Sequence, residues 1–232
     1  ELAKVPAEWL VGIPEGRDAL WAMSLGTAGL TAMQCVLALE GHGTTANNAD
    51  DYPVVVTGAT GGVGSIAVAL LAALGYRVTA VSGRPELEGY LRHLGASEVL
   101  ARSELADKPS RALGRERFAA GVDVVGGSTL ASVLSQTRYG GCIAACGLAG
   151  SAELQTTVHP FILRGITLVG IDSTRAPREL RENAWRRLSR DLPTPLLEEM
   201  RVIEPLERVP ELAEEILEGR IKGRVVIDVA AS

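Results

Sequence analysis

The chain has 232 residues, 47% of them hydrophobic, which is enough for one large domain or for one domain with part of another. A net charge of −5 and the lack of a basic stripe interleaved with aromatic residues argue against a nucleic-acid partner. No charged segment followed by an apolar one opens the chain, and its longest apolar stretches are interrupted well short of a membrane span. We therefore expect a cytoplasmic protein that does not associate with membranes.

The chain opens with an extended piece and a turn over residues 1–15. Residues 17–40 have apolar side chains at helical spacing, interrupted by Gly26 and Gly29. This pattern predicts two helices that meet at the glycine pair, the second capped by Gly41. Polar, turn-forming residues over 42–51 then predict a loop.

A glycine-rich turn over residues 58–64 lies between a β-branched run at 54–57 and an apolar stretch at 65–74. A second strand is predicted over 77–81. Strand, glycine turn, helix and strand within about thirty residues are typical of a dinucleotide-binding βαβ unit. The glycine spacing differs from the commoner Gly-x-Gly-x-x-Gly, so a glycine turn without a ligand remains the alternative.

Each glycine of the turn has a physical reason. Gly58 permits the tight turn out of the strand, and Gly64 lets the helix pack closely on the sheet. A Cβ at Gly61 or Gly62 would obstruct a diphosphate at the helix N-terminus, where free N–H groups and the helix dipole favour an anion. The turn therefore predicts a diphosphate site.

The residues after the second strand indicate which dinucleotide binds. NAD sites usually carry Asp or Glu there to accept hydrogen bonds from the ribose 2′-OH, but this chain has Ser82, Gly83 and Arg84. A hydroxyl and a guanidinium suit a 2′-phosphate, which an acid would repel. The prediction is NADPH, and the alternative for Arg84 is a solvated loop charge.

Four further strands are predicted over residues 98–100, 122–125, 141–146 and 167–171. A charged surface helix with loops is predicted over 103–120, and Ser128 is predicted to cap a helix that runs to Arg138. The alternation predicts an α/β fold with a doubly wound, parallel six-stranded Rossmann sheet in the order 3-2-1-4-5-6. Arg102, at the carboxyl end of the third strand, is placed to reach the adenosine phosphate. Asp123 is assigned a structural rather than a catalytic place.

An amphipathic helix is predicted over 177–192, with Arg186, Arg187 and Arg190 on a solvated face. The prolines in residues 192–195 are interpreted as an interruption between elements of secondary structure. The extended piece at 200–205, the helix at 210–217 and the strand at 223–229 do not continue the Rossmann alternation. Unpaired strands there would leave open edges, so we expect a homo-oligomer.

Cys142 and Cys146 lie four residues apart on one predicted strand, about 13 Å from each other. This separation excludes a shared zinc ion or a disulfide between them, and all three cysteines are interpreted as core thiols. His42, His93 and His159 are scattered along the chain and are interpreted as surface residues. No zinc-ligand cluster is therefore expected.

Several motifs carry a family resemblance: Gly26-Thr27-Ala28-Gly29, Thr57-Gly-Ala-Thr-Gly-Gly-Val-Gly64, Ser82-Gly83-Arg84, Ala145-Cys-Gly-Leu-Ala-Gly150, Pro160-Phe-Ile-Leu-Arg164 and Gly223-Arg224. The chain resembles medium-chain dehydrogenases/reductases of the quinone-oxidoreductase type, and most of all the bacterial acrylyl-CoA reductase (NADPH) subfamily. Members begin with a GroES-like catalytic domain. The resemblance implies remnants of that domain at 1–15 and 196–232 around an NADP-binding domain at 16–195.

The resemblance also implies a set of cofactor contacts. Gly61, Gly62, Val63 and Gly64 would hold the diphosphate, Ser82, Gly83, Arg84 and Arg102 the 2′-phosphate side, and Leu148, Ile162 and Ser173 the nicotinamide half. Thr27 is a further candidate, with plain helix packing as its alternative.

The implied reaction is zinc-independent hydride transfer from NADPH to the β-carbon of an activated alkene such as acrylyl-CoA, with protonation at the α-carbon. An NADPH:quinone oxidoreductase and a non-catalytic NADPH-binding module are the alternatives. No catalytic residue is assigned. Tyr139 is the one candidate proton donor, and packing is its simpler interpretation.

Overall fold

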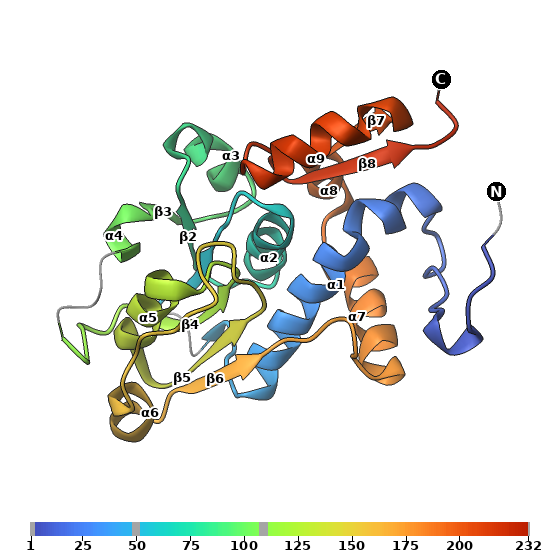
Figure 1. The fold of residues 1–232 in the computed structure, drawn as a ribbon. Coiled ribbons are helices and arrows are strands. Elements are labelled where there is room, and N and C mark those ends of the chain that lie inside the picture. The colour runs from blue at the N-terminus through green and yellow to red at the C-terminus, as the bar shows by residue number, and fades with distance from the viewer. Residues whose placement is uncertain (1–2, 48–51, 107–110, 232) are drawn as a thin grey trace.

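The computed structural model of the chain describes residues 3–47, 52–106 and 111–231, so the predicted segments at 1–15, 42–51 and 103–120 lie partly outside the described residues. A six-stranded parallel sheet forms its centre (Figure 1). Its strands are β1 (Val54–Thr57), β2 (Val78–Ser82), β3 (Glu98–Ala101), β4 (Phe118–Asp123), β5 (Thr137–Ala145) and β6 (Thr167–Gly170). Their order is β3-β2-β1-β4-β5-β6, which confirms the predicted doubly wound topology.

The central strands β1, β2 and β4 are buried along their whole length, because helices cover both faces of the sheet. Val56 of β1 pairs with Ala80 of β2 and with Val122 of β4. Since all strands are parallel, their carboxyl ends meet at one edge of the sheet. The loops that could hold a ligand emerge at that edge.

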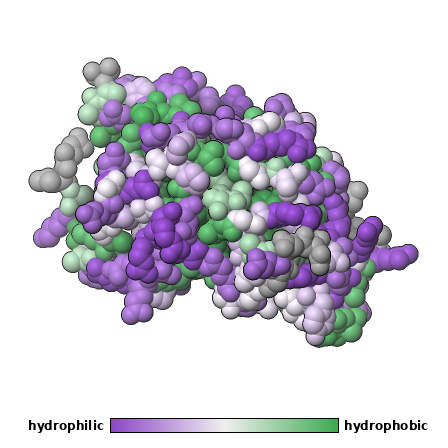
Figure 2. All heavy atoms as spheres, turned by 180° about the vertical axis from the view of Figure 1, so that it is seen from behind, coloured by the Kyte–Doolittle hydropathy of each residue, from purple (hydrophilic) through white to green (hydrophobic). Residues whose placement is uncertain are grey.

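The helices form two layers, one on each face of the sheet, and each layer packs through its own hydrophobic cluster. One face of the sheet packs against α1 (Ala19–Gly41), α2 (Gly62–Ala73) and α7 (Arg178–Asp191), the other against α4 (Ser103–Ala106), α5 (Gly127–Gln136) and α6 (His159–Arg164). A short 3-10 helix, η3 (Pro85–Leu87), leads into α3 (Glu88–His93). Seen from behind, apolar residues reach the surface only in patches interrupted by hydrophilic ones (Figure 2).

Helix α1 bends at Gly26, whose φ of 49° and ψ of −146° are not helical, and this confirms two helical pieces that meet there. Asp18 caps its start by accepting a hydrogen bond from the Trp21 N–H. By length and composition alone, α1 could cross a membrane, contrary to our expectation that the apolar stretches fall short of a span. However, 67% of its most apolar window is buried inside the protein, as in the core helix of a globular domain.

The fourth strand begins four residues before the predicted start. Phe118, Ala119 and Ala120 are buried in the sheet rather than lying on a charged surface segment. The prediction that Ser128 caps the following helix was also wrong. Helix α5 begins at Gly127, and the buried carboxylate of Asp123 accepts a hydrogen bond of 2.8 Å from the Gly126 N–H just before it.

Arg187 does not lie on a solvated face, because only 14% of its side chain is exposed. Its guanidinium donates to both carboxylate oxygens of Glu40, at 2.8 and 2.9 Å, and to Asp191, and so ties α7 to α1. Burial alone would raise the pKa of Asp191, but hydrogen bonds from Arg190 and Arg187 outweigh it and lower this pKa. Arg186 and Arg190 are exposed, as predicted.

The described chain from Thr194 onward lies above α2 and the first half of α1 (Figure 1), and its buried Leu197 and Met200 join the same hydrophobic cluster as those helices. It consists of α8 (Thr194–Met200), β7 (Arg201–Pro205), η4 (Leu206–Arg208), α9 (Val209–Leu217) and β8 (Arg224–Asp228). Strands β7 and β8 pair in parallel, so the prediction of unpaired strands was wrong. Helix α8 was not predicted, because its prolines were interpreted as a chain break although proline favours the first turn of a helix.

Candidate cofactor site

The glycine turn after β1 brings the backbone directly onto the first turn of α2. Gly58 has a φ of +59°, which L-residues rarely adopt, and a Cβ at Gly64 would lie 2.3 Å from the carbonyl oxygen of Gly58. Within the described residues, no side chain caps α2 at its N-cap residue, Gly61. The first-turn amides and the positive end of the helix dipole are therefore left for an anion.

A cavity of about 630 Å³ opens in front of this helix terminus, between the carboxyl edge of the sheet and the β7–α9–β8 unit. This volume lies within the range of small-molecule sites. One wall is the glycine turn with the loops after β2 and β3. The other wall is apolar and comes from α9 and β8: Val209, Leu212, Ala213, Ile216, Val225 and Ile227.

Arg84 lines the cavity and reaches across it. Its Nε donates to Thr60 Oγ1 at 3.2 Å and its Nη2 to the Thr60 carbonyl at 3.2 Å. The same guanidinium donates to the carbonyls of Arg220 and Ile221, at 3.1 and 3.0 Å. All four acceptors are neutral, so Arg84 keeps its full positive charge available for an anion.

Arg102 lies beside Arg84, over the intervening Gly83. A Cβ at Gly83 would come within 3.0 Å of the Arg102 guanidinium carbon, so a side chain there would displace this arginine. Ser82 is buried, and its hydroxyl accepts a 3.0 Å hydrogen bond from the Arg84 N–H, which shapes the turn. The structure thus brings two cations to the place where the sequence predicts the 2′-phosphate.

A third arginine, Arg224, enters the cavity from the first residue of β8. Its Nε donates to the Ser24 carbonyl at 2.8 Å, and a Cβ at Gly62 would lie 3.2 Å from its Nη1. Burial lowers the pKa of Arg224 below its usual value. An anion bound here would offset both the half-buried charge of Arg224 and the positive end of α2, so this geometry suits a diphosphate.

Arg224 was missed as a site residue. The signal in the sequence was the motif Gly223-Arg224, which carried the resemblance but was given no role. Its position depends on β8 pairing with β7 and on the Gly223 N–H donating to the Thr60 carbonyl at 3.0 Å. These contacts are long-range and cannot be read from local spacing.

The electrostatic balance of the cavity is positive. Among the residues that the structure describes, neither Arg84 nor Arg102 nor Arg224 forms an ion pair with a carboxylate. Of the described residues that line the cavity, only Glu218 is acidic, and it pairs with Arg220 at 2.5 Å. Two phosphate-sized anions would therefore meet three cations and one helix N-terminus.

The residues predicted for the nicotinamide half do not line this cavity. Leu148 is 66% exposed and Ile162 is 70% exposed, and Ser173 is half-buried after β6. Thr27 lines a different cavity of about 350 Å³, with Trp9, Leu10 and Trp185. The structure brings together the diphosphate and 2′-phosphate residues, and these four positions stay predictions.

Tyr139 lies far from the carboxyl edge of the sheet. It is the third residue of β5 and is 74% exposed, whereas the strand ends at Ala145. The register of β5 shifts between Thr137, which pairs with Phe118, and Cys142, which pairs with Ala120, so Tyr139 lies in an irregular stretch at the amino-terminal side of the strand. Tyr139 is not part of the cavity lining, and its exposure contradicts the packing interpretation as well.

Beneath the glycine turn, Asp123 joins the ends of β1 and β4. The Thr57 hydroxyl donates to Asp123 Oδ1 at 2.6 Å, and the Thr57 oxygen in turn accepts from the Val124 N–H at 3.2 Å. Burial raises the pKa of Asp123, although hydrogen bonds from Thr57 and from the amides of Gly126 and Val125 limit the shift. Its place is structural, as predicted.

The described part of the chain offers no ligand set for zinc. No group of three or more His, Cys, Asp or Glu side chains in residues 3–47, 52–106 and 111–231 could hold a metal ion.

Comparison with known proteins places this site in a family context. Residues 62–190 match the family model described as "Zinc-binding dehydrogenase". The acrylyl-CoA reductase AcuI of Ruegeria pomeroyi is 52% identical over 229 residues, which are 99% of this chain and 68% of that protein. YhfP of Bacillus subtilis, described as a candidate quinone oxidoreductase, is 45% identical over 98% of this chain and 68% of its own length.

Solved structures agree in fold. The structure of Escherichia coli K-12 YhdH with bound NADPH matches 98% of this chain and 69% of its own, with 51% identity and a TM-score of 0.94. That of B. subtilis YhfP with bound NAD matches 98% of this chain and 68% of its own, with 44% identity and a TM-score of 0.92. The chain therefore belongs to the zinc-binding dehydrogenase family of medium-chain dehydrogenases/reductases.

Proposed function

We propose that the protein is an NADPH-dependent reductase of the C=C bond of an activated alkene such as acrylyl-CoA. The observation that carries the cofactor assignment is the uncapped start of α2, which opens onto a cavity with Arg84, Arg102 and Arg224. The alkene assignment rests on the 52% identity to an acrylyl-CoA reductase. The cofactor held there would provide the hydride that the β-carbon of the alkene accepts.

The residues of this chain divide the binding of the cofactor between two anion sites. Gly61, Gly62 and the following amides of α2, with Arg224, would hold the diphosphate. Arg84 and Arg102 would hold the 2′-phosphate, in place of the carbonyls that Arg84 now contacts. The apolar wall from α9 would exclude water from this half of the cofactor.

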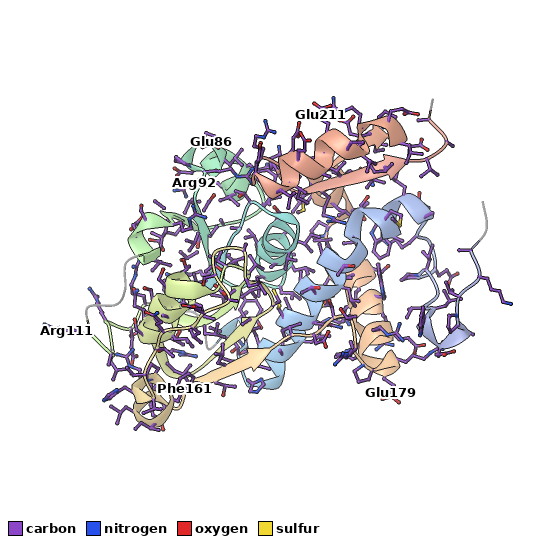
Figure 3. All side chains as sticks on the ribbon, in the orientation of Figure 1. Glu86, Arg92, Arg111, Phe161, Glu179 and Glu211 are labelled. Carbon is purple, nitrogen blue, oxygen red and sulfur yellow. The ribbon has the colours of Figure 1, made fainter. Side chains whose placement is uncertain are left out.

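Replacing Arg84 with alanine is expected to weaken NADPH binding about 10- to 100-fold and NADH binding less than about threefold, because charge-assisted hydrogen bonds are each worth about 1.5–3 kcal/mol. Fluorescence titration of both nucleotides measures the two affinities. The matched control is Arg92→Ala on the neighbouring α3 (Figure 3), whose side chain pairs with Glu88 outside the cavity. Equal affinities of the unmodified protein for NADPH and NADH would contradict the assignment.

Replacing Arg224 with glutamine is expected to weaken NADPH and NADH binding by the same factor, about tenfold, since both nucleotides carry the diphosphate. The control is Arg208→Gln, which removes a half-buried arginine paired with Glu211 on α9 (Figure 3). A loss confined to NADPH would place Arg224 on the 2′-phosphate instead of the diphosphate.

The acceptor is tested by NADPH oxidation in the presence of acrylyl-CoA or of a benzoquinone. Faster turnover of acrylyl-CoA supports the proposal, and faster turnover of the quinone would make the protein a quinone oxidoreductase. Binding of NADPH without turnover of either compound would indicate a non-catalytic binding module.

We further propose a cytoplasmic homo-oligomer in which residues 16–195 bind the cofactor and residues 1–15 and 196–232 belong to a catalytic domain. Because β7 and β8 pair with each other, unpaired strands no longer argue for association. The apolar side chains of Val202 and Ile203 on β7, each 49% exposed, support association instead.

A further inference from the structure

A short segment near the end of the chain forms part of the cavity wall. We call it the strap: it runs from Gly219 to Gly223 and lies between α9 and β8. Both end residues have a positive φ, +70° and +61°, which glycine adopts more readily than any other residue. Gly219, Ile221 and Gly223 all line the cavity. The strap therefore borders the site where the proposed cofactor would bind.

Arg84 fastens the middle of the strap to the glycine turn. Its guanidinium donates to the carbonyls of Arg220 and Ile221, at 3.1 and 3.0 Å. The same guanidinium donates to the hydroxyl and to the carbonyl of Thr60, both at 3.2 Å. At the far end of the strap, the Gly223 N–H donates to this Thr60 carbonyl at 3.0 Å. One side chain thus joins the strap to the turn that precedes α2.

The number of donors on Arg84 limits what else it can hold. A guanidinium has five N–H groups, and the four hydrogen bonds to the strap and to Thr60 occupy four of them. In the bidentate geometry that is frequent between arginine and phosphate, the phosphate takes two N–H groups. Arg84 therefore cannot hold a 2′-phosphate in this geometry and keep all four hydrogen bonds.

The hydrogen bonds to the strap are the ones that can be released at the lower cost. The contact between Arg84 and the Arg220 carbonyl lies at the exposed surface, so water can replace the guanidinium there. Thr60 is buried in the glycine turn, where water does not replace a lost donor as easily. A phosphate that engages Arg84 is therefore expected to displace the strap and not Thr60.

We propose that the strap is a latch that responds to the 2′-phosphate of the cofactor. Arg84 holds the strap closed through its carbonyls, and a 2′-phosphate takes over the guanidinium and releases the strap. NADH carries a hydroxyl at this position, so it does not compete for the charge of Arg84 and leaves the strap closed. This inference rests on the proposed function, which assigns Arg84 to the 2′-phosphate.

Lys222 provides a second and weaker hold on the strap. Its side chain is exposed, and its Nζ lies 4.6 Å from the centroid of the Tyr90 ring on α3. A cation–π contact at an exposed site is weak, so it cannot keep the strap closed once Arg84 has left. It stabilises the closed strap only, and its removal favours the open strap.

Limited proteolysis of the full chain measures the opening of the strap, because trypsin cleaves after Arg220 and after Lys222. Digests without nucleotide, with AMP and with adenosine 2′,5′-bisphosphate are compared, and the peptides are quantified by mass spectrometry. Cleavage after Arg111, which is exposed and does not line the cavity, is the internal reference. We expect the bisphosphate to raise strap cleavage about tenfold relative to this reference, and AMP to leave it unchanged.

Arginine variants test the latch without a nucleotide. The Arg84→Ala variant is expected to show the raised strap cleavage in the absence of nucleotide and no further change with the bisphosphate. The matched control is Arg92→Ala on α3, whose side chain pairs with Glu88, and its strap cleavage should equal that of the unmodified chain. Strap cleavage in Arg84→Ala at the level of the unmodified chain would contradict the hold of Arg84 on the strap.

Tyr90 variants test the latch with Arg84 intact. Tyr90→Leu removes a contact of the closed strap only, so it is expected to bind the bisphosphate about two- to fivefold more tightly and AMP with unchanged affinity. Tyr90→Phe keeps the ring beneath Lys222 and should bind both compounds like the unmodified chain. Weaker binding of the bisphosphate by Tyr90→Leu would contradict a closed strap that opposes it.

Calorimetry of both compounds separates the latch from the proposed function. Binding of the bisphosphate with unchanged or reduced strap cleavage would overturn the latch and leave the cofactor assignment standing. Equal opening of the strap by AMP would overturn the response to the 2′-phosphate. If the unmodified chain binds neither the bisphosphate nor NADPH, the proposed function is wrong and the latch with it.

Discussion

Replacing Gly64 with alanine is expected to abolish measurable NADPH binding and to lower the free energy of unfolding by about 3 kcal/mol. The added Cβ would lie 2.3 Å from the Gly58 carbonyl oxygen and 2.7 Å from the Ala59 Cα. These are backbone atoms of the glycine turn, so only a shift of the turn away from α2 relieves the clash. Such a shift separates the two halves of the diphosphate site. Fluorescence titration and urea unfolding measure the two effects.

The control for this substitution is Gly89→Ala, on the short helix α3. A Cβ there meets nothing within 4 Å, and the backbone is not in the left-handed region. Alanine favours the helix over glycine, so we expect unchanged NADPH binding and equal or slightly higher stability. A Gly64→Ala protein with the affinity and unfolding midpoint of the unmodified chain would contradict the close approach of turn and helix.

Replacing Asp123 with alanine is expected to lower the free energy of unfolding by about 2–4 kcal/mol at neutral pH. The carboxylate is fully buried and accepts from the Thr57 hydroxyl and the Gly126 N–H. Alanine leaves both donors without their acceptor at the junction of β1, β4 and the first turn of α5. Urea unfolding measures the loss, and a change below about 0.5 kcal/mol would contradict the network.

The same residue predicts a dependence of stability on pH. Burial raises the pKa of Asp123 above the value of about 3.9 in the unfolded chain. Between these two pKa values the native state binds more protons than the unfolded state, so stability falls as pH rises through the interval. The Asp123→Asn variant has no ionisable group at this position, so its free energy of unfolding does not fall across the interval. The stability advantage of the unmodified chain over the Asn variant should therefore narrow from about pH 4 upward and become constant above the folded-state pKa.

Thr57→Ser serves as the control for this network. It keeps the hydroxyl that donates to Asp123 and accepts from the Val124 N–H. We expect the pH dependence of the unmodified chain with only a small loss of stability from the missing methyl group. If the Thr57→Ser variant has the pH profile of Asp123→Asn, the pH dependence of stability comes from the packing of Thr57 and not from the carboxylate.

The site residues that the sequence predicted are those whose motifs lie within a short stretch of the chain. Gly58 and Gly64 belong to one turn, and Arg84 follows the strand that ends beside this turn, so spacing alone placed them together. Arg224 is more than a hundred residues away in sequence, and its contact with Gly62 depends on the docking of β8. The same reason explains why Tyr139 was misplaced, because its distance from the crevice depends on where β5 begins.

The sequence by itself determined the order of the six strands, the glycine turn and the kind of anion that the turn suits. Each of these follows from chain-local physics: the alternation of apolar segments, the positive φ of Gly58 and the lack of an acid after β2. Only the tertiary structure decided the parallel pairing of β7 with β8 and the third cation of the cavity. These features join segments that are distant along the chain. They depend on how α1, α2 and β8 pack against one another, which the local sequence pattern does not specify.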